Sequence, residues 1–95
     1  MGTQTRRYVI CYDICDAKRL QRIAKLLQSY GARVQKSVFE CQLSNDRLER
    51  LRKKAEGVMD LQEDSLLIYH LPPSFTREGL GRGEGEGLEL DLWVV

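Results

Sequence analysis

The chain of 95 residues has the size of one small domain, and its 42% hydrophobic and 31% charged residues are typical of a soluble globular protein rather than a disordered one. No apolar run approaches the roughly 20 residues that a membrane-spanning helix needs, and the start, MGTQTRRY, lacks the apolar stretch of a secretory signal, so we expect a cytoplasmic protein that does not bind membranes. The net charge of +1 conceals an uneven distribution, because residues 1–54 hold 13 basic and 5 acidic residues whereas residues 55–95 hold 2 and 9.

The first predicted element is a strand over residues 8–14, YVICYDI, in which nearly every position is apolar. This pattern is typical of a strand that is covered on both faces. Asp16 is placed to cap a helix predicted for residues 16–30, and Gly31 follows its last turn, where a left-handed residue often ends a helix. The helix has an apolar face formed by Leu20, Ile23, Ala24, Leu27 and Tyr30 and a basic face formed by Lys18, Arg19, Arg22 and Lys25.

The middle of the chain predicts further strands around a second helix. Residues 33–43, RVQKSVFECQL, suit one long strand or two short strands that turn near residues 35–37, and the sequence leaves both open. Ser44 caps the second predicted helix. Residues 65–71, SLLIYHL, form the next strand, which two prolines end. The buried stripe of the second helix is formed by Leu48, Leu51, Ala55 and Val58.

The C-terminal part predicts a linker and one more strand. Residues 77–87, REGLGRGEGEG, are rich in alternating glycines and match neither phosphate-binding glycine motif, so we interpret them as a flexible linker. Residues 88–95, LELDLWVV, predict an apolar strand. An apolar strand after a flexible linker is a candidate for joining the sheet of a partner subunit, and packing within its own subunit is the alternative.

The order of the elements predicts a ferredoxin-like βαββαβ fold, an α+β sandwich of the α/β class. We expect this domain in residues 1–76, the linker in 77–87 and a dimer-completing strand in 88–95. Because two helices cover one face of a sheet and the strands are apolar on both faces, we expect a two-fold homodimer in which the open faces of two sheets meet.

The titratable residues exclude several chemistries. His70 is the single histidine and lies within a predicted strand, so serine and cysteine hydrolase arrangements have no support. Cys11, Cys15 and Cys41 lack the spacing of a zinc site, and we expect them to be reduced and buried. The basic half of the chain predicts attraction to phosphate, with solvated helix faces as the plain alternative.

Asp13 lies near the end of the first predicted strand, on the same face as Val9 and Cys11 and opposite Tyr12. One interpretation pairs it with an arginine of the following helix or lets it share the cap with Asp16. The other makes it a metal ligand, because Mg²⁺ takes one or two carboxylates and keeps several waters. Two copies across a dimer axis would hold one ion, and such an ion supports phosphodiester hydrolysis.

Three segments, YVICYDI, RLQRIAKLLQSYGARVQKSVFECQL and DSLLIYHL, together resemble the CRISPR-associated Cas-two family, the small ferredoxin-like partner in the pair of proteins that acquires new spacers. The resemblance covers about residues 8–71, and the ending LDLWVV fits the family's tail strand. The motifs YD at a strand end, YG-x-RVQ and SVFE occur in the family's order, and the combination is specific.

The resemblance implies a homodimer whose tail strand completes the partner's sheet. It implies that Asp13 is the catalytic residue and binds Mg²⁺, which Mn²⁺ could replace, together with its two-fold mate. It also implies an endonuclease acting on single-stranded RNA or double-stranded DNA, and a bridge to the CRISPR integrase partner protein. The residues that it adds as nucleic-acid-binding or supporting are Tyr12, Arg22, Arg33, Ser37 and Phe39.

Each of these residues also has a structural alternative. Tyr12 and Phe39 suit core aromatics, the two arginines suit surface charges, and Ser37 suits a turn. Two other functions stay open beside the nuclease. One is a non-catalytic DNA-binding scaffold that meets a partner integrase through the acidic C-terminal half, and the other is a toxin-like ribonuclease of the same fold.

Overall fold

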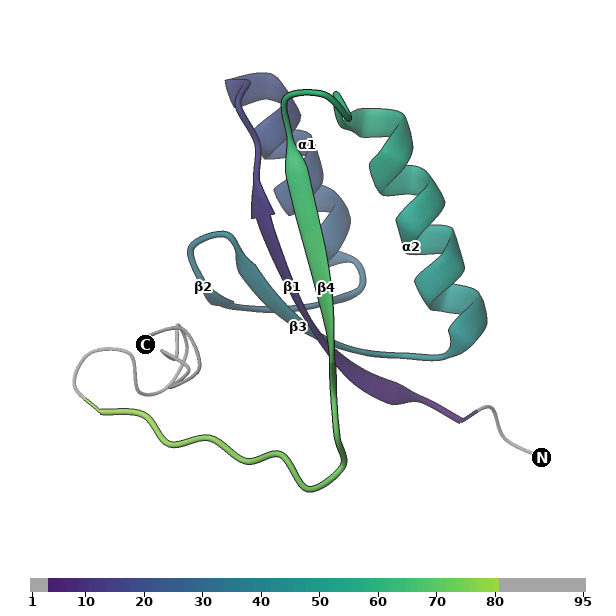
Figure 1. Ribbon diagram of the computed structural model, residues 1–95, viewed down its shortest axis with the longest axis vertical. Coiled ribbons are helices and arrows are strands. Elements are labelled where there is room, and N and C mark those ends of the chain that lie inside the picture. The colour runs from purple at the N-terminus through teal and green to yellow at the C-terminus, as the bar shows by residue number, and fades with distance from the viewer. Residues whose placement is uncertain (1–3, 81–95) are drawn as a thin grey trace.

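The computed structural model describes residues 4–80, which form a four-stranded sheet and two helices (Figure 1). No helix in this range is both long and apolar enough to cross a membrane. The elements, in chain order, are β1 (Arg6–Asp13), α1 (Ala17–Gln28), β2 (Gly31–Gln35), β3 (Val38–Leu43), α2 (Asn45–Val58) and β4 (Ser65–Leu71).

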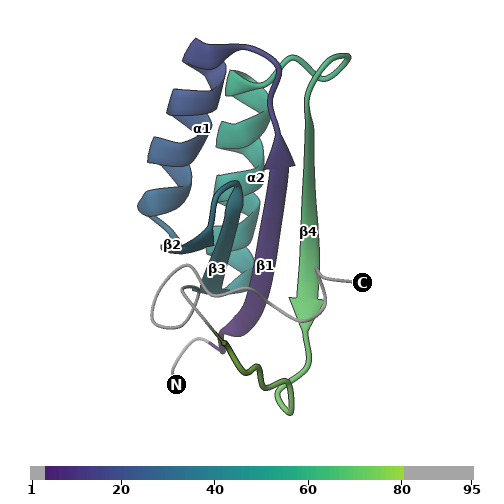
Figure 2. The same ribbon diagram turned by 90° about the vertical axis from the view of Figure 1, so that its left-hand side faces the viewer.

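The sheet has the strand order β2-β3-β1-β4, and every neighbouring pair is antiparallel. Both helices lie on the same side of it, and the other side faces away from them (Figure 2). We call this second side the open face. The order of elements and the strand order are those of a ferredoxin-like α+β sandwich, so the predicted fold class is confirmed.

Alternation along β1 divides the core between the two faces. Tyr8, Ile10 and Tyr12 point toward the helices, where they join the main apolar cluster with residues of β3, α1 and α2. Val9 is fully buried on the open face and belongs to a second, smaller cluster. The central strand is therefore apolar on both sides, which explains why its sequence shows no polar alternation.

Each helix begins where the sequence predicts. The Asp16 carboxylate accepts a hydrogen bond from the Arg19 backbone N–H at 3.0 Å, and the Ser44 hydroxyl accepts one from the Arg47 backbone N–H at 3.2 Å. These bonds satisfy backbone donors that the first turn of a helix leaves free. The predicted buried stripe of α2 is also present, with Leu51 and Ala55 almost fully covered.

Residues 33–43 form two strands, because the chain turns at Lys36 and Ser37 between β2 and β3. Ser37 adopts a φ of 68°, a left-handed conformation that is rare for residues other than glycine.

The predicted left-handed cap at Gly31 is wrong. Ser29 caps α1 in a right-handed conformation, and Gly31 is the first residue of β2, where it lies against β3.

The segment after β4 folds back over part of the open face. Phe75 packs against the cluster of Val9, Val34, Val38 and Leu71. Arg7 donates to the Phe75 carbonyl oxygen at 3.2 Å and to Glu40 at 2.9 Å, and Arg77 reaches the same carboxylate at 2.5 Å. The strand predicted for 88–95 and most of the linker predicted for 77–87 lie outside the described residues.

Candidate nucleic-acid and metal site

Asp13 is the last residue of β1 and is exposed on the open face. No residue between 4 and 80 forms an ion pair or hydrogen bond with its carboxylate. The arginine of α1 that could have paired with it, Arg19, binds Asp64 instead, and Asp16 alone caps the helix. Both structural alternatives for Asp13 are therefore wrong, and the carboxylate is available to a ligand.

The surface around Asp13 is apolar and only partly covered. In β4, Ser65 lies opposite Asp13, Leu67 opposite Cys11, and Tyr69 opposite Val9. Leu67 is 53% exposed and Tyr69 is 44% exposed, whereas Phe75 packs against Val9 and Leu71 on the same face. Beside this covered cluster, the open face thus carries two large, partly exposed side chains and one carboxylate.

Tyr12, Arg33 and Ser37 meet on the other side of the sheet. They line a hollow of about 210 Å³ whose walls come from β1, α1, β2 and the β2–β3 turn. The Tyr12 backbone N–H donates to the Ser37 carbonyl oxygen at 3.1 Å, which ties the turn to the end of β1. The cationic side chains of the hollow are Arg33 and Lys36, so a bound anion there would meet positive charge from β2 and from the turn.

The environment of the Tyr12 phenol combines opposing effects. Burial raises the pKa of this group, and the positive charge of the neighbouring Arg33 partly offsets the rise. The phenol therefore stays protonated and contributes a hydrogen-bonding group rather than a base. Its contacts with Arg33 and Ser37 connect three of the residues that the family resemblance singles out.

Phe39 is fully buried, so its ring is a core side chain and is not presented to a ligand. It lies 6.1 Å from the Tyr12 ring, and the Arg33 guanidinium lies 5.5 Å from its centroid. A cation over an aromatic face is attracted by the electrons of the ring. Phe39 therefore stabilises the position of the Arg33 guanidinium through its ring. Its burial favours the role of a core aromatic over direct contact with nucleic acid.

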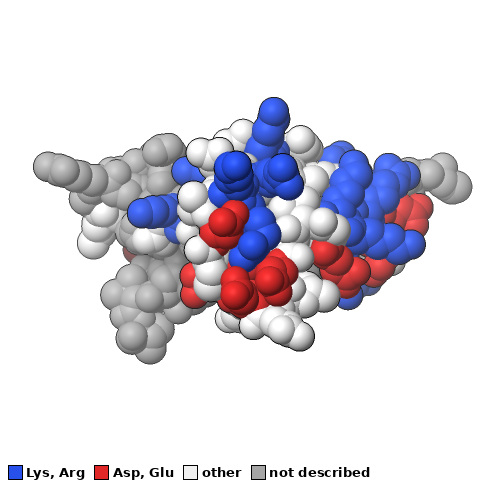
Figure 3. Space-filling view, turned by 90° about the horizontal axis from the view of Figure 1, so that it is seen from above, with Lys and Arg blue, Asp and Glu red and all other residues white. Residues whose placement is uncertain are grey.

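Arg22 is exposed on α1 and forms no ion pair within the described range. The helix has four basic residues and no acidic one, and of the four only Arg19 is bound to carboxylates among residues 4–80. Figure 3 views the end of the molecule where α1 begins and α2 ends, and it shows the basic side chains in two groups with acidic side chains beside each. The helix α1 thus presents three basic side chains that form no ion pair within residues 4–80.

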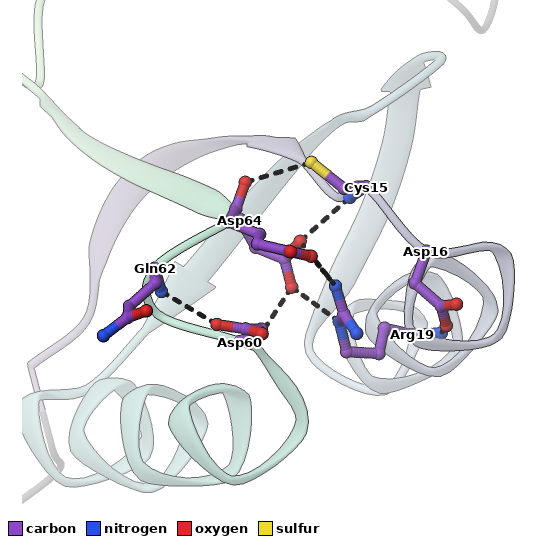
Figure 4. Close-up of polar contacts among 7 residues, drawn as sticks. Cys15, Asp16, Arg19, Asp60, Gln62 and Asp64 are labelled. Carbon is purple, nitrogen blue, oxygen red and sulfur yellow. Dashed lines mark hydrogen bonds and ion pairs between the residues drawn. The ribbon is translucent and has the colours of Figure 1, made fainter.

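The cluster around Asp64 was not predicted from the sequence (Figure 4). Its carboxylate is fully covered and accepts hydrogen bonds from Arg19 Nε at 2.8 Å and Nη2 at 3.2 Å. It also accepts from the backbone N–H groups of Cys15 and Asp60, each at 2.9 Å. In the sequence, Asp64 is recognisable only as a charged residue just before an apolar strand. Its pairing with Arg19 could not be predicted, because the two residues lie 45 positions apart.

The bond to Arg19 holds the pKa of Asp64 well below its usual range, and the backbone bonds from Asp60 and Cys15 add to this effect. The bonds of this pair also raise the pKa of Arg19.

The three cysteines form no disulfide. Burial raises the pKa of Cys41 to about 11 and also raises that of Cys11, while Cys15 is exposed, contrary to the expectation that all three are buried.

The family of CRISPR associated protein Cas2 matches residues 6–76. The chain belongs to the Cas2 family. It is 49% identical over 78 residues to the CRISPR-associated endonuclease Cas2 2 of a Thermus thermophilus strain, covering 82% of this chain and 84% of the relative. It is 48% identical over 64 residues to the CRISPR-associated endoribonuclease Cas2 3 of a Synechocystis strain, covering 67% and 70%.

Solved structures of similar proteins, one of them a Cas2, share the fold. The crystal structure of Streptococcus pyogenes Cas2 at pH 6.5 has a TM-score of 0.72 and 32% identity, and the match covers 79% of this chain and 99% of that one. A hypothetical protein from Thermus thermophilus has a TM-score of 0.75 and 45% identity, and the match covers 81% and 94%. The ferredoxin-like arrangement of this chain is therefore that of its family.

Asp13 offers an oxygen donor of the kind that Mg²⁺ prefers. Carboxylate oxygens suit Mg²⁺, but residues 4–80 contain no group of three or more acidic, histidine or cysteine side chains that could hold an ion. A single carboxylate would hold Mg²⁺ only together with waters or with donors from outside these residues.

Proposed function

We propose that this Cas2 family protein is a homodimer that binds nucleic acid and hydrolyses phosphodiester bonds with the help of Mg²⁺. The observation that carries the proposal is the exposed Asp13 carboxylate, which has no partner within residues 4–80 and borders a partly exposed apolar surface. The names of the relatives, endonuclease and endoribonuclease, support the same reaction class.

The exposed apolar side chains of the open face favour a second copy of the chain as the partner of this face. Leu67 and Tyr69 are large and exposed, and covering them would remove apolar surface from water. A two-fold interface brings the same patch of both subunits together. Because Asp13 lies on this face, such an interface brings two carboxylates toward one axis.

The Asp13 carboxylates of the two subunits would hold the ion. When bound, Mg²⁺ supplies Lewis-acid stabilisation of the phosphate and lowers the pKa of a bound water. Arg22 and Arg33 hold the phosphate backbone as exposed cations, so binding is salt-dependent. The backbone bond between Tyr12 and Ser37 holds the turn that follows β2, the strand that carries Arg33.

A second candidate function is a scaffold in spacer acquisition, which holds duplex DNA and bridges a partner integrase without cleavage. The observation that favours it is the positive face of α1, where Lys18, Arg22 and Lys25 form no ion pair with any residue from 4 to 80 and Asp13 plays no part. Phosphate contacts give affinity and orientation without reading sequence. Both functions can belong to one protein.

The substitution Asp13→Asn separates the two functions. It keeps the size of the side chain and removes its charge, so we expect Mg²⁺-dependent cleavage of single-stranded RNA and duplex DNA to be lost while nucleic-acid binding is retained. The control is Asp46→Asn, which removes an exposed carboxylate from the first turn of α2. Wild-type cleavage rates in Asp13→Asn would refute the nuclease proposal, and loss of binding in the same variant would contradict the separation.

A further inference from the structure

We propose that Arg19 and Asp64 form a clamp that positions Asp13 for metal binding, an inference that rests on the proposed function. The clamp ties the first turn of α1 to residues 59–64, the connection between α2 and β4. The same arginine also binds Glu63 of this connection. Both partners flank the end of β1, where Asp13 is the last residue.

The clamp is directional. Arg19 meets the Asp64 carboxylate through two nitrogens, at 2.8 and 3.2 Å, and its Nη2 also reaches Glu63 at 3.3 Å (Figure 4). Two bonds between a guanidinium and both oxygens of a carboxylate fix orientation as well as distance. The same two oxygens of Asp64 also accept from the backbone N–H groups of Cys15 and Asp60.

These bonds hold the backbone that follows Asp13 and the backbone that lies opposite it in the sheet. Across the sheet, Asp13 is paired with Ser65, the residue that follows Asp64 in the chain. Further along the chain, the Cys15 backbone N–H is bound to the Asp64 carboxylate, and the Cys15 thiol donates to the Glu63 carbonyl oxygen at 3.0 Å. Local opening is easiest where few contacts hold the chain, so without the clamp the last pair of β1 would open more often.

A positioning role differs from simple stabilisation of the fold. Within residues 4–80, no hydrogen bond or ion pair joins the clamp side chains to the Asp13 carboxylate, so they act on it through the backbone. Groups that orient a metal ligand typically change metal affinity by about 10–100-fold when they are altered. A stabilising contact elsewhere in the fold would leave the affinity of the folded protein unchanged.

The test compares Asp64→Asn, which loses the charge, and Arg19→Lys, which keeps the charge but loses the paired nitrogens. The control is Glu49→Gln, which removes an exposed ion pair with Arg52 on α2. Melting curves first establish conditions in which the variants are folded, and Arg19→Lys carries the test if Asp64→Asn does not fold. Two quantities are then measured: the exchange rate of the Cys15 amide in metal-free protein, and the dissociation constant for Mn²⁺ by electron paramagnetic resonance.

We expect faster Cys15 amide exchange and about tenfold or greater weakening of Mn²⁺ binding in Asp64→Asn, a smaller effect in Arg19→Lys, and wild-type values in Glu49→Gln. If the folded variants Asp64→Asn and Arg19→Lys bind Mn²⁺ as tightly as wild type, the positioning role of the clamp is refuted, whereas the proposed function stands. Equal Mn²⁺ affinity in wild type and Asp13→Asn would instead refute the proposed function, and the clamp with it.

Discussion

Gly31 provides a test of the sheet in which the magnitude follows from the structure. A Cβ atom at this position would lie 2.5 Å from Cys41 Sγ and 3.0 Å from Cys41 Cα, and it would also collide with the Glu40 backbone carbonyl oxygen. Cys41 is almost fully buried, so β3 cannot yield easily. The substitution Gly31→Ala must therefore push the edge strand β2 away from β3.

The expected cost combines two effects. Overpacking costs about 1–3 kcal/mol, and loss of one ladder hydrogen bond costs about 0.5–1.5 kcal/mol. We therefore expect Gly31→Ala to lower the free energy of unfolding by about 1.5–4.5 kcal/mol, a large share of the roughly 5–15 kcal/mol that is typical of a domain.

Gly57→Ala is the matched control. Gly57 lies within α2, and nothing lies within 4 Å of a Cβ atom built there. Alanine in place of glycine inside a helix should raise the free energy of unfolding by about 0.5–1 kcal/mol. Urea unfolding followed by circular dichroism gives both values, at one protomer concentration because dimerisation adds to apparent stability.

The reasoning fails if Gly31→Ala unfolds within about 0.5 kcal/mol of wild type, well below the expected overpacking cost, or if the two glycine variants change stability in the same direction. A double-mutant cycle with Cys41→Ala adds a sharper condition. Cys41→Ala removes the Sγ atom but leaves the Glu40 carbonyl oxygen in place. In the Cys41→Ala background, Gly31→Ala should therefore lower the free energy of unfolding by less than in wild type, but should still lower it.

Three further predictions concern the core, the acid limit and the basic face. Phe39→Leu should lower the free energy of unfolding by about 1–3 kcal/mol because the ring is fully buried, as melting curves would show. Because the pKa of Asp64 is depressed in the folded state, its stabilising effect is complete above about pH 4–5 and is lost as the pH falls further, so Asp64→Asn should flatten acid unfolding curves. Arg22→Gln should reduce the slope of log affinity against log salt by about 0.7–0.9, and an unchanged slope would exclude Arg22 as a phosphate contact.

The fold could be predicted largely because its signals are local. Asp16 and Ser44 cap helices whose apolar faces recur at helical spacing, and both caps are present. The sequence did not decide between one long strand and two strands with a turn in residues 33–43, because Lys36 and Ser37 are not residues that favour a tight hairpin. Gly31 was misassigned since a glycine after a helix and a glycine required by strand contact look alike in sequence.

The site could be predicted only in part. The isolated carboxylate of Asp13 was recognisable in the sequence, but its lack of an arginine partner among residues 4–80 was not. That outcome depends on Asp64, which takes Arg19 across 45 positions of chain. Likewise, the family resemblance named Phe39 and Arg33 together as nucleic-acid-binding or supporting residues. The sequence did not show that Phe39 is buried whereas Arg33 is exposed.

The stoichiometry of Mn²⁺ binding tests the central claim most directly. Titration of the folded protein, with its mass measured in the same solution, should give one tightly bound ion for two chains, and Asp13→Asn should abolish this binding. One ion for each chain, a monomer that binds the ion, or unchanged binding by Asp13→Asn would contradict a metal site shared by two Asp13 carboxylates.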